Sequence, residues 1–235
     1  MENKLYDAVE KIEILDRSES IKKKFLHLYV LKMRNHYADG KVSQEYTYEA
    51  SVRRNLDAVA VICFSKNHQQ PKNPTVFLRN TFRPPLLLRA YREKIDACTT
   101  PMMLTPETQP LLLEVAAGIL EDSDRSLADI EKRALAEVWE EFGFRLRPTS
   151  MFQLGSGTFP TPGLNPEKIL LYAAEILDPT QRQPPSTDGS PTEEVATFVD
   201  MPLQTALQAC LKGDIADAKT EICLHRLQKL LEKKG

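Results

Sequence analysis

The sequence predicts an α/β fold for this chain of 235 residues. Short stretches of the length of strands occur at 57–65, 75–79, 111–115, 150–156, 169–177 and 195–199, and most of them are apolar. Apolar positions recur at three- and four-residue spacing over 126–142, which predicts an amphipathic helix, and 201–234 is predicted to form two more helices. Hydrophobic residues make up 42% of the chain and charged residues 27%, as expected for a protein with a sizeable core.

The N-terminal segment 1–55 is predicted to form a helix and β-hairpin segment that precedes a larger domain at 56–235. Stretches 24–34 and 42–53 are strand-like, and Ala38-Asp39-Gly40-Lys41 between them is a turn signal. An isolated hairpin is barely stable in water. We therefore expect this hairpin to pack on its own domain or on a second subunit.

Charge and cysteine usage narrow the possible partners. The formal net charge is −2, so nucleic acid is not expected as a partner, and a polyanionic ligand would need local positive charge or a metal ion. No apolar run has the length of a membrane span, and the N-terminus lacks the apolar core of a signal peptide. The four cysteines have no CxxC pairing, which indicates neither a zinc site nor a disulfide framework: Cys63, Cys98, Cys210 and Cys223. A cytoplasmic location follows as an expectation.

The predicted helix at 126–142 carries an unusual set of carboxylates. Ser126 is a suitable N-cap and Gly143 a suitable C-terminal stop. Glu137 and Glu141 are four residues apart, so they lie on one helix face, with Glu140 flanking them. Like charges placed in this way repel each other, and a hard divalent cation would explain them. The alternative is a solvated acidic helix face. The preceding Ala116-Ala117-Gly118 is predicted to be a tight turn after the strand at 111–115.

These residues resemble the motif of the Nudix hydrolases, the Nudix box. The match comprises Gly118 and the run Glu137-Val138-Trp139-Glu140-Glu141-Phe142-Gly143-Phe144. There are two departures: Ala136 replaces the arginine of the box, and Gly118 lies four residues too far upstream, so one box glutamate has no clear counterpart. Arg133, on the same helix face as Glu137, is a candidate to orient the glutamates in place of that arginine. The resemblance implies a Mg²⁺ site, with Mn²⁺ possible, whose ligands are Glu137, Glu140, Glu141 and the Ala117 carbonyl.

Other stretches resemble the branch of the family that hydrolyses ADP-ribose and nucleoside diphosphate sugars. The run 80–85 is similar to a Gln-aromatic-Arg-Pro-Pro segment in which the arginine reaches the substrate diphosphate, here Arg83. The run 158–167 is similar to a Ser-Pro-Gly-x-x-x-Glu loop that ends at Glu167, and 213–220 matches a Gly-x-Ile-x-Asp-x-Lys-Thr turn. The resemblance thus implies a substrate site formed by Arg83, Glu114 and Glu167.

A polar, Pro/Gly/Ser-rich segment at 178–192 is predicted to be a mobile loop, and it ends in Glu193-Glu194. By resemblance one of these two glutamates acts as a general base or extra metal ligand, and Glu140 is the third catalytic candidate. Residues 86–110 are rich in Pro and Thr and are predicted to be an irregular insertion.

The resemblance implies a Nudix α/β/α sandwich, with a mixed sheet between the box helix and the C-terminal helix. The expected reaction is metal-dependent hydrolysis of the diphosphate of ADP-ribose or a related nucleoside diphosphate sugar, giving a nucleoside monophosphate and a sugar phosphate. A homodimer formed through the N-terminal strands is also expected. Two alternatives stay open: a different Nudix substrate, such as a dinucleoside polyphosphate or an oxidised nucleotide, and a non-catalytic module that binds nucleotide sugars or a protein.

Overall fold

The computed structural model describes residues 9–23, 25–66, 69–70, 72–90, 110–186 and 197–234. The chain divides into two compact units. The first unit comprises Met1–Asp57 and Phe159–Lys168, and the second comprises Ala58–Thr158 and Ile169–Gly235. The boundary at residue 57 lies close to the expected one at 55, but the loop at 159–168 groups with the N-terminal strands.

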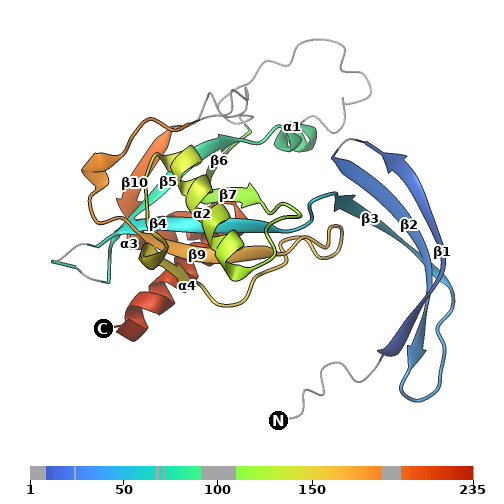
Figure 1. The fold of residues 1–235 in the computed structure, drawn as a ribbon. Helices are drawn as coiled ribbons and strands as arrows, with labels where there is room; N and C mark the ends of the chain where they lie inside the picture. Colours follow the sequence, from blue (N-terminus) through green and yellow to red (C-terminus); the bar gives the residue numbers. More distant parts are fainter. Residues whose placement is uncertain are drawn as a thin grey trace. The chain divides into compact units, whose positions relative to one another are not determined.

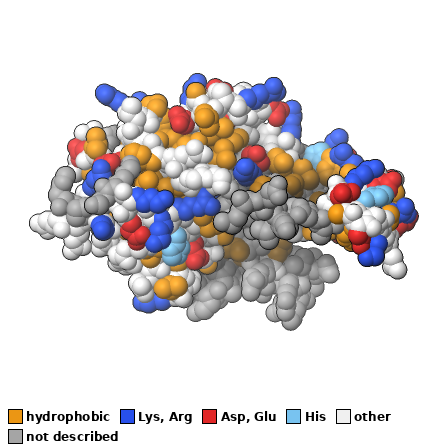
Figure 2. All heavy atoms as spheres, turned by 90° about the horizontal axis from the view of Figure 1, so that it is seen from below, with side chains coloured by type: hydrophobic (Ala, Val, Ile, Leu, Met, Phe, Trp, Pro, Cys, Tyr) orange, Lys and Arg blue, Asp and Glu red, His pale blue; other side chains and the backbone are white. Residues whose placement is uncertain are grey.

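The first unit is built on an antiparallel sheet of β1 (Val9–Lys22), β2 (Leu26–Tyr37) and β3 (Tyr46–Arg53), in that order. The expected hairpin is β2 and β3, and β1 is a strand where a helix had been expected. This difference has a physical reason, because β1 pairs with β2 along nearly its whole length and so satisfies backbone groups that would otherwise form an open edge. Acidic, basic and histidine side chains are interspersed over this unit, on the right of Figure 2.

The second unit contains a mixed sheet of seven strands within the described ranges. They are β4 (Ala58–Ser65), β5 (Thr75–Phe82), β6 (Leu111–Glu114), β7 (Ala116–Ile119), β8 (Met151–Gln153), β9 (Ile169–Glu175) and β10 (Phe198–Pro202). The order is β10-β5-β4-β9-β8, with β6 beside β5 and β7 beside β4. The β4–β9 pair is parallel and the other pairs are antiparallel.

Helices cover both faces of this sheet (Figure 1). Helix α2 (Leu127–Phe142) packs on one face, and α3 (Leu203–Lys212) and α4 (Ala218–Lys234) pack on the other. Strand β4 is buried on both sides, which explains its nearly continuous apolar sequence. Its alternate residues Val59, Val61 and Cys63 face α2, and Ala60, Ile62 and Phe64 face α3 and α4. The predicted α/β/α sandwich is therefore confirmed.

The shorter elements complete the unit. Helix α1 (Pro85–Ala90) follows β5, and the 3₁₀ turns η3 (Pro148–Ser150) and η4 (Pro179–Gln181) precede β8 and follow β9. The predicted turn at 116–118 is wrong, because these residues belong to β7. The chain leaves β5 at Glu114 and pairs with β4 from Ala116 onward, and three small residues carry no side-chain pattern that would reveal this exchange. Within the described ranges, the helices lack the combination of length and hydrophobicity that a membrane span needs.

Candidate active site

The ends of α2 set the orientation of its carboxylates. Ser126 and Asp129 form a capping box, in which the Ser126 hydroxyl accepts from the Asp129 N–H and the Asp129 carboxylate accepts from the Ser126 N–H. The helix ends at Gly143, which has a left-handed backbone with φ 70° and donates its N–H to the Trp139 carbonyl. The caps define the length of the helix, and its buried residues Ala134, Val138 and Phe142 face the sheet, with Glu137 and Glu141 directed to β7.

Both carboxylates meet neighbouring residues of β7. A Cβ atom added to Gly118 would lie 1.9 Å from Glu137 Oε1, so this carboxylate occupies the space that any larger residue would fill. The Ala117 N–H donates to Glu141 Oε2 at 3.0 Å. The two outer glutamates of the predicted metal site therefore converge on the Ala117–Gly118 backbone.

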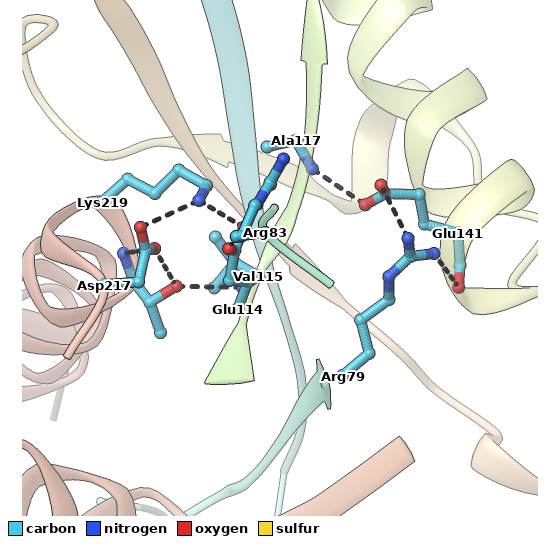
Figure 3. Close-up of polar contacts among 9 residues, drawn as sticks. Arg79, Arg83, Glu114, Val115, Ala117, Glu141, Asp217 and Lys219 are labelled. Carbon is cyan, nitrogen blue, oxygen red and sulfur yellow. Dashed lines mark hydrogen bonds and ion pairs between the residues drawn. The ribbon is translucent and has the colours of Figure 1, made fainter. Parts of the chain in front are cut away.

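A buried arginine that sequence reasoning did not select lies against Glu141. Arg79, on β5, is only 2% exposed. Its Nη2 lies 3.4 Å from Glu141 Oε1, and its Nη1 donates to the Glu141 carbonyl at 3.4 Å (Figure 3). Burial raises the pKa of the Glu141 carboxyl, whereas the charge of Arg79 and the bond from Ala117 act in the opposite direction. The available signal was an arginine that directly follows the buried apolar run Val76-Phe77-Leu78.

The remaining box candidates lie differently. Glu140 is exposed on α2. Arg133 donates to Asp124 at 3.1 Å and lies 3.3 Å from Glu121, so the structure joins it to the loop before α2. Burial alone would lower the pKa of the Arg133 guanidinium, but the bond to Asp124 and nearby negative charges, Glu137 included, raise it. Its contacts thus differ from the expected orienting contacts with the box glutamates.

A second charged cluster lies where β6 meets the start of α4. Arg83 donates to both oxygens of Glu114, at 2.7 and 2.5 Å, and Lys219 donates to the same carboxylate at 2.5 Å (Figure 3). Burial would raise the pKa of Glu114, but the bond from Arg83 and the charge of Lys219 outweigh it and leave the pKa below its ordinary value. The Arg83 side chain is still 44% exposed, so part of this guanidinium faces solvent.

The 213–220 turn holds Lys219 in this cluster. Asp217 accepts from the Thr220 N–H at 3.0 Å and hydroxyl at 2.6 Å, and its other oxygen lies 3.0 Å from Lys219 Nζ. The Thr220 hydroxyl in turn accepts from the Val115 N–H at 3.0 Å. Sequence reasoning noted this turn but did not assign Lys219 to a site.

The other predicted site residues have different outcomes. Glu114 is 1% exposed and both of its oxygens are occupied by Arg83 and Lys219. Glu167 lies in the first unit, where it forms an ion pair with Arg53. Glu193 and Glu194 lie outside the described residues, as does 91–109, which is most of the predicted insertion.

The donor set around Ala117–Gly118 fits a hard divalent cation in its chemistry, since it consists of two carboxylates and backbone oxygen. No group of three or more His, Cys, Asp or Glu side chains placed to hold a metal ion occurs within the described part of the chain. The residues that would hold the ion are Glu137, Glu141 and the Ala117 carbonyl. A third carboxylate ligand is not placed beside them in the described part of the chain.

Comparison with known proteins gives matches over part of the chain. No family model matches the chain. It is 32% identical to GDP-mannose pyrophosphatase of Cronobacter sakazakii over 119 residues, which are 50% of this chain and 56% of the relative. The corresponding enzymes of Klebsiella pneumoniae and Escherichia coli are 32% and 31% identical, over 118 and 117 residues, each covering 50% of this chain. The matches cover 54% and 56% of the lengths of these two enzymes. The chain therefore spans about half the length of the curated relatives that it matches.

A solved structure shows the fold independently. The crystal structure of an ADP compounds hydrolase superposes with a TM-score of 0.58 at 16% identity, covering 97% of this chain and 98% of that one. The box residues, the sandwich fold and these partial matches agree with the resemblance of the chain to Nudix hydrolases of the ADP-ribose and nucleoside diphosphate sugar pyrophosphatase branch.

Proposed function

We propose that this chain is a metal-dependent hydrolase of the diphosphate bond in ADP-ribose or a related nucleoside diphosphate sugar. The observation that carries the proposal is the convergence of Glu137 and Glu141 on Ala117–Gly118. The names of the relatives, GDP-mannose pyrophosphatase and ADP compounds hydrolase, support the substrate class. The products would be a nucleoside monophosphate and a sugar phosphate.

Each cluster has a role in this proposal. A divalent cation, Mg²⁺ or alternatively Mn²⁺, would supply positive charge to the diphosphate and make the attacking water more acidic. Glu137, Glu141 and the Ala117 carbonyl would hold it, with the exposed Glu140 as a further ligand or base. The solvent-facing part of Arg83 would bind phosphate oxygens in a planar fork. Glu114 would act on the substrate indirectly, because it holds Arg83 and Lys219 side by side.

Hydrolysis requires one water and a proton acceptor. The water oxygen bonds to one phosphorus, the bond from that phosphorus to the bridging oxygen breaks, and the bridging oxygen leaves with the other phosphate. Glu193 or Glu194 is proposed to take the proton of the water. Glu167 is proposed as a further substrate contact through the loop at 158–167.

The test is release of inorganic phosphate in an assay coupled to a phosphatase. ADP-ribose, GDP-mannose and a UDP-sugar are compared with a dinucleoside polyphosphate and an oxidised nucleotide, each with Mg²⁺, with Mn²⁺ and with a chelator. We expect metal-dependent release from a sugar nucleotide and a loss of several orders of magnitude in Glu137→Gln and Glu141→Gln. Turnover that persists in both variants would remove the metal site from the proposal.

A binding module without catalysis is the second candidate. It is favoured by the absence of a three-carboxylate group within the described residues. Calorimetric titration with ADP-ribose separates the two functions, because a pure binding module would bind the ligand and release no phosphate from any of the compounds.

A homodimer formed through the first unit is also proposed. Strand β1 is at the edge of its sheet and exposes several large apolar side chains, namely Val9, Ile12, Ile14, Leu15 and Ile21. A cytoplasmic location, without nucleic acid or membrane as a partner, is proposed as well. The free thiols of Cys63, Cys210 and Cys223 support a reducing compartment.

A further inference from the structure

Glu141 is held at both of its carboxylate oxygens by two different strands. On β7, the Ala117 N–H donates to Oε2 at 3.0 Å. On β5, Arg79 Nη2 lies 3.4 Å from Oε1, while Nη1 reaches the Glu141 main-chain carbonyl at 3.4 Å. Arg79 thus spans the side chain and the backbone of the same residue, near the C-terminus of α2.

Two arginines that are nearer to Glu141 in the sequence have other contacts. Arg133 pairs with Asp124 and Glu121, and the Arg145 guanidinium lies over the Trp139 ring at 4.0 Å from its centroid. Position 136, where the Nudix box has arginine, is alanine. The buried charge next to Glu141 therefore comes from the sheet and not from α2.

Arg79 is suited to fix a geometry because its own position is rigid. Its backbone pairs with Phe198 of β10 on one side and with Glu114 of β6 on the other. Its side chain is almost fully buried, so it has little freedom to leave Glu141 for solvent. A planar guanidinium can also contact two acceptors at once, which a lysine ammonium at the same position cannot do with the same geometry.

We propose that Arg79 is a positioning residue that fixes the Glu141 carboxylate in the rotamer needed at the metal site. In the Nudix box an arginine at position 136 of the helix would orient the glutamates. Here the position is alanine, and Arg79 on strand β5 has this orienting role instead. This inference rests on the proposed function, because it assumes that Glu141 is a metal ligand. Arg79 touches neither the substrate nor the metal in this role.

The experiment compares full-length proteins by their affinity for Mn²⁺ alone, measured by calorimetry without substrate, and then by kcat and KM for ADP-ribose. Arg79→Lys keeps the positive charge, so a change in Mn²⁺ affinity or in kcat reports the lost geometry of the guanidinium and not a lost charge. We expect its Kd for Mn²⁺ to rise about tenfold or more and its kcat to fall by a similar factor, because such supporting partners typically contribute that much. KM should change by less than about threefold, since ground-state binding of the substrate is kept.

A rescue variant separates positioning from a purely structural role. Adding Ala136→Arg to Arg79→Lys should restore part of both Mn²⁺ affinity and kcat, whereas Ala136→Arg alone should stay within about twofold of the parent. The matched control is Arg226→Met. Arg226 donates to the Leu154 and Ser156 carbonyls, so this variant should lose stability and keep the parent affinity for Mn²⁺.

Two results would overturn the inference. The first is Arg79→Lys with parental Mn²⁺ affinity and kcat. The second is much tighter Mn²⁺ binding by the Ala136→Arg single variant, which would show that Glu141 is not positioned in the parent. This measurement does not need Arg79→Lys, so it can be made even if that variant does not fold. A parent that binds no Mn²⁺ and hydrolyses no sugar nucleotide would instead refute the proposed function, and the inference with it.

Discussion

At the scale of single residues, Glu114 and Glu141 show two ways of balancing a buried carboxylate. Burial raises the pKa of Glu141, although Arg79 and the Ala117 N–H oppose the rise. Glu114 has two cations instead of one, and its pKa lies below the ordinary value in spite of burial. Burial is the largest influence on the pKa of both carboxyls. The cations oppose it more strongly at Glu114, because Arg83 and Lys219 contact Glu114 at 2.5–2.7 Å, whereas Arg79 reaches Glu141 at 3.4 Å.

The lowered pKa of Glu114 predicts how stability depends on pH. A carboxyl whose folded-state pKa is depressed stabilises the fold above its unfolded pKa, about 4.3, and this contribution is lost as pH falls through the folded pKa. Glu114→Gln should therefore lower the free energy of unfolding by about 3 kcal/mol near neutral pH. The difference from the parent should shrink in acid. Urea denaturation across this range measures it. Glu140→Gln, which removes an exposed carboxylate, is the control, and an equal effect in both variants would contradict the prediction.

Gly118→Ala tests the close approach of Glu137. The new methyl group would lie 1.9 Å from Glu137 Oε1, but the atom that must move is the end of a flexible side chain. We expect turnover to fall by about two orders of magnitude, because the carboxylate is displaced, while thermal unfolding changes little. The two measurements are made on the same preparation. A variant that keeps both activity and stability would show that the position of Glu137 is not required.

At the scale of elements, α2 is defined by its ends and by its contact with β7. The capping box at Ser126 and the left-handed Gly143 are local features, and they fix where the helix begins and ends. Gly143 has a second role. Its carbonyl accepts from the Gln183 N–H at 2.9 Å, and a Cβ atom there would lie 1.8 Å from the Gln183 carbonyl oxygen. The end of α2 is therefore packed against the segment that follows η4.

This packing predicts different effects at two similar helix ends. Gly213, which ends α3, has nearly the same backbone, with φ 85° against 70° for Gly143, but nothing lies within 4 Å of its added Cβ. Gly213→Ala should lower the free energy of unfolding by about 1–2 kcal/mol from backbone strain alone. Gly143→Ala should lower it by clearly more, because backbone must also move. Chemical denaturation of both variants provides the comparison, and equal losses would show that the contact with Gln183 has no energetic weight.

At the scale of the whole molecule, the chain consists of two units, the α/β/α sandwich and the unit built on β1, β2 and β3. The sandwich has a continuous core on both faces of its sheet. The described residues of the first unit form no comparable core, because most residues of β2 are half-buried and those of β1 are mostly exposed. A three-stranded sheet of this kind gains stability when its apolar side chains are covered.

We therefore expect a dimer that depends on β1. Ile12 and Ile14 are 56% and 59% exposed and lie on one face of the strand. Replacing both with lysine should convert a dimer at micromolar concentration into a monomer, as measured by light scattering coupled to size-exclusion chromatography. The control replaces Leu211, an exposed apolar residue on α3, with lysine. A monomeric parent, or a double variant that remains dimeric, would refute this assembly.

Local patterns were enough to predict most elements and the carboxylates of α2. The helix, its caps and the hairpin depend on residues that are close in sequence, so spacing and turn chemistry reveal them. Predictions failed where the chain exchanges partners without a sequence signal. Strand β7 was expected to be a turn, and β1 was expected to be helical, because strand pairing with a distant segment decided both.

The sequence by itself therefore determined the sandwich, the face of α2 that is buried, and the glutamates that this helix presents. Only the tertiary structure decided which cations serve them. Arg79 reaches Glu141 across 62 positions of sequence, and Lys219 reaches Glu114 across 105. Such pairs depend on the order and the register of the strands and on the packing of α2 and α4. A one-residue change in register would move the strand residues Arg79 and Glu114 to the opposite face of the sheet. Periodicity encodes which face of an element is apolar, but not which distant charge will lie against it.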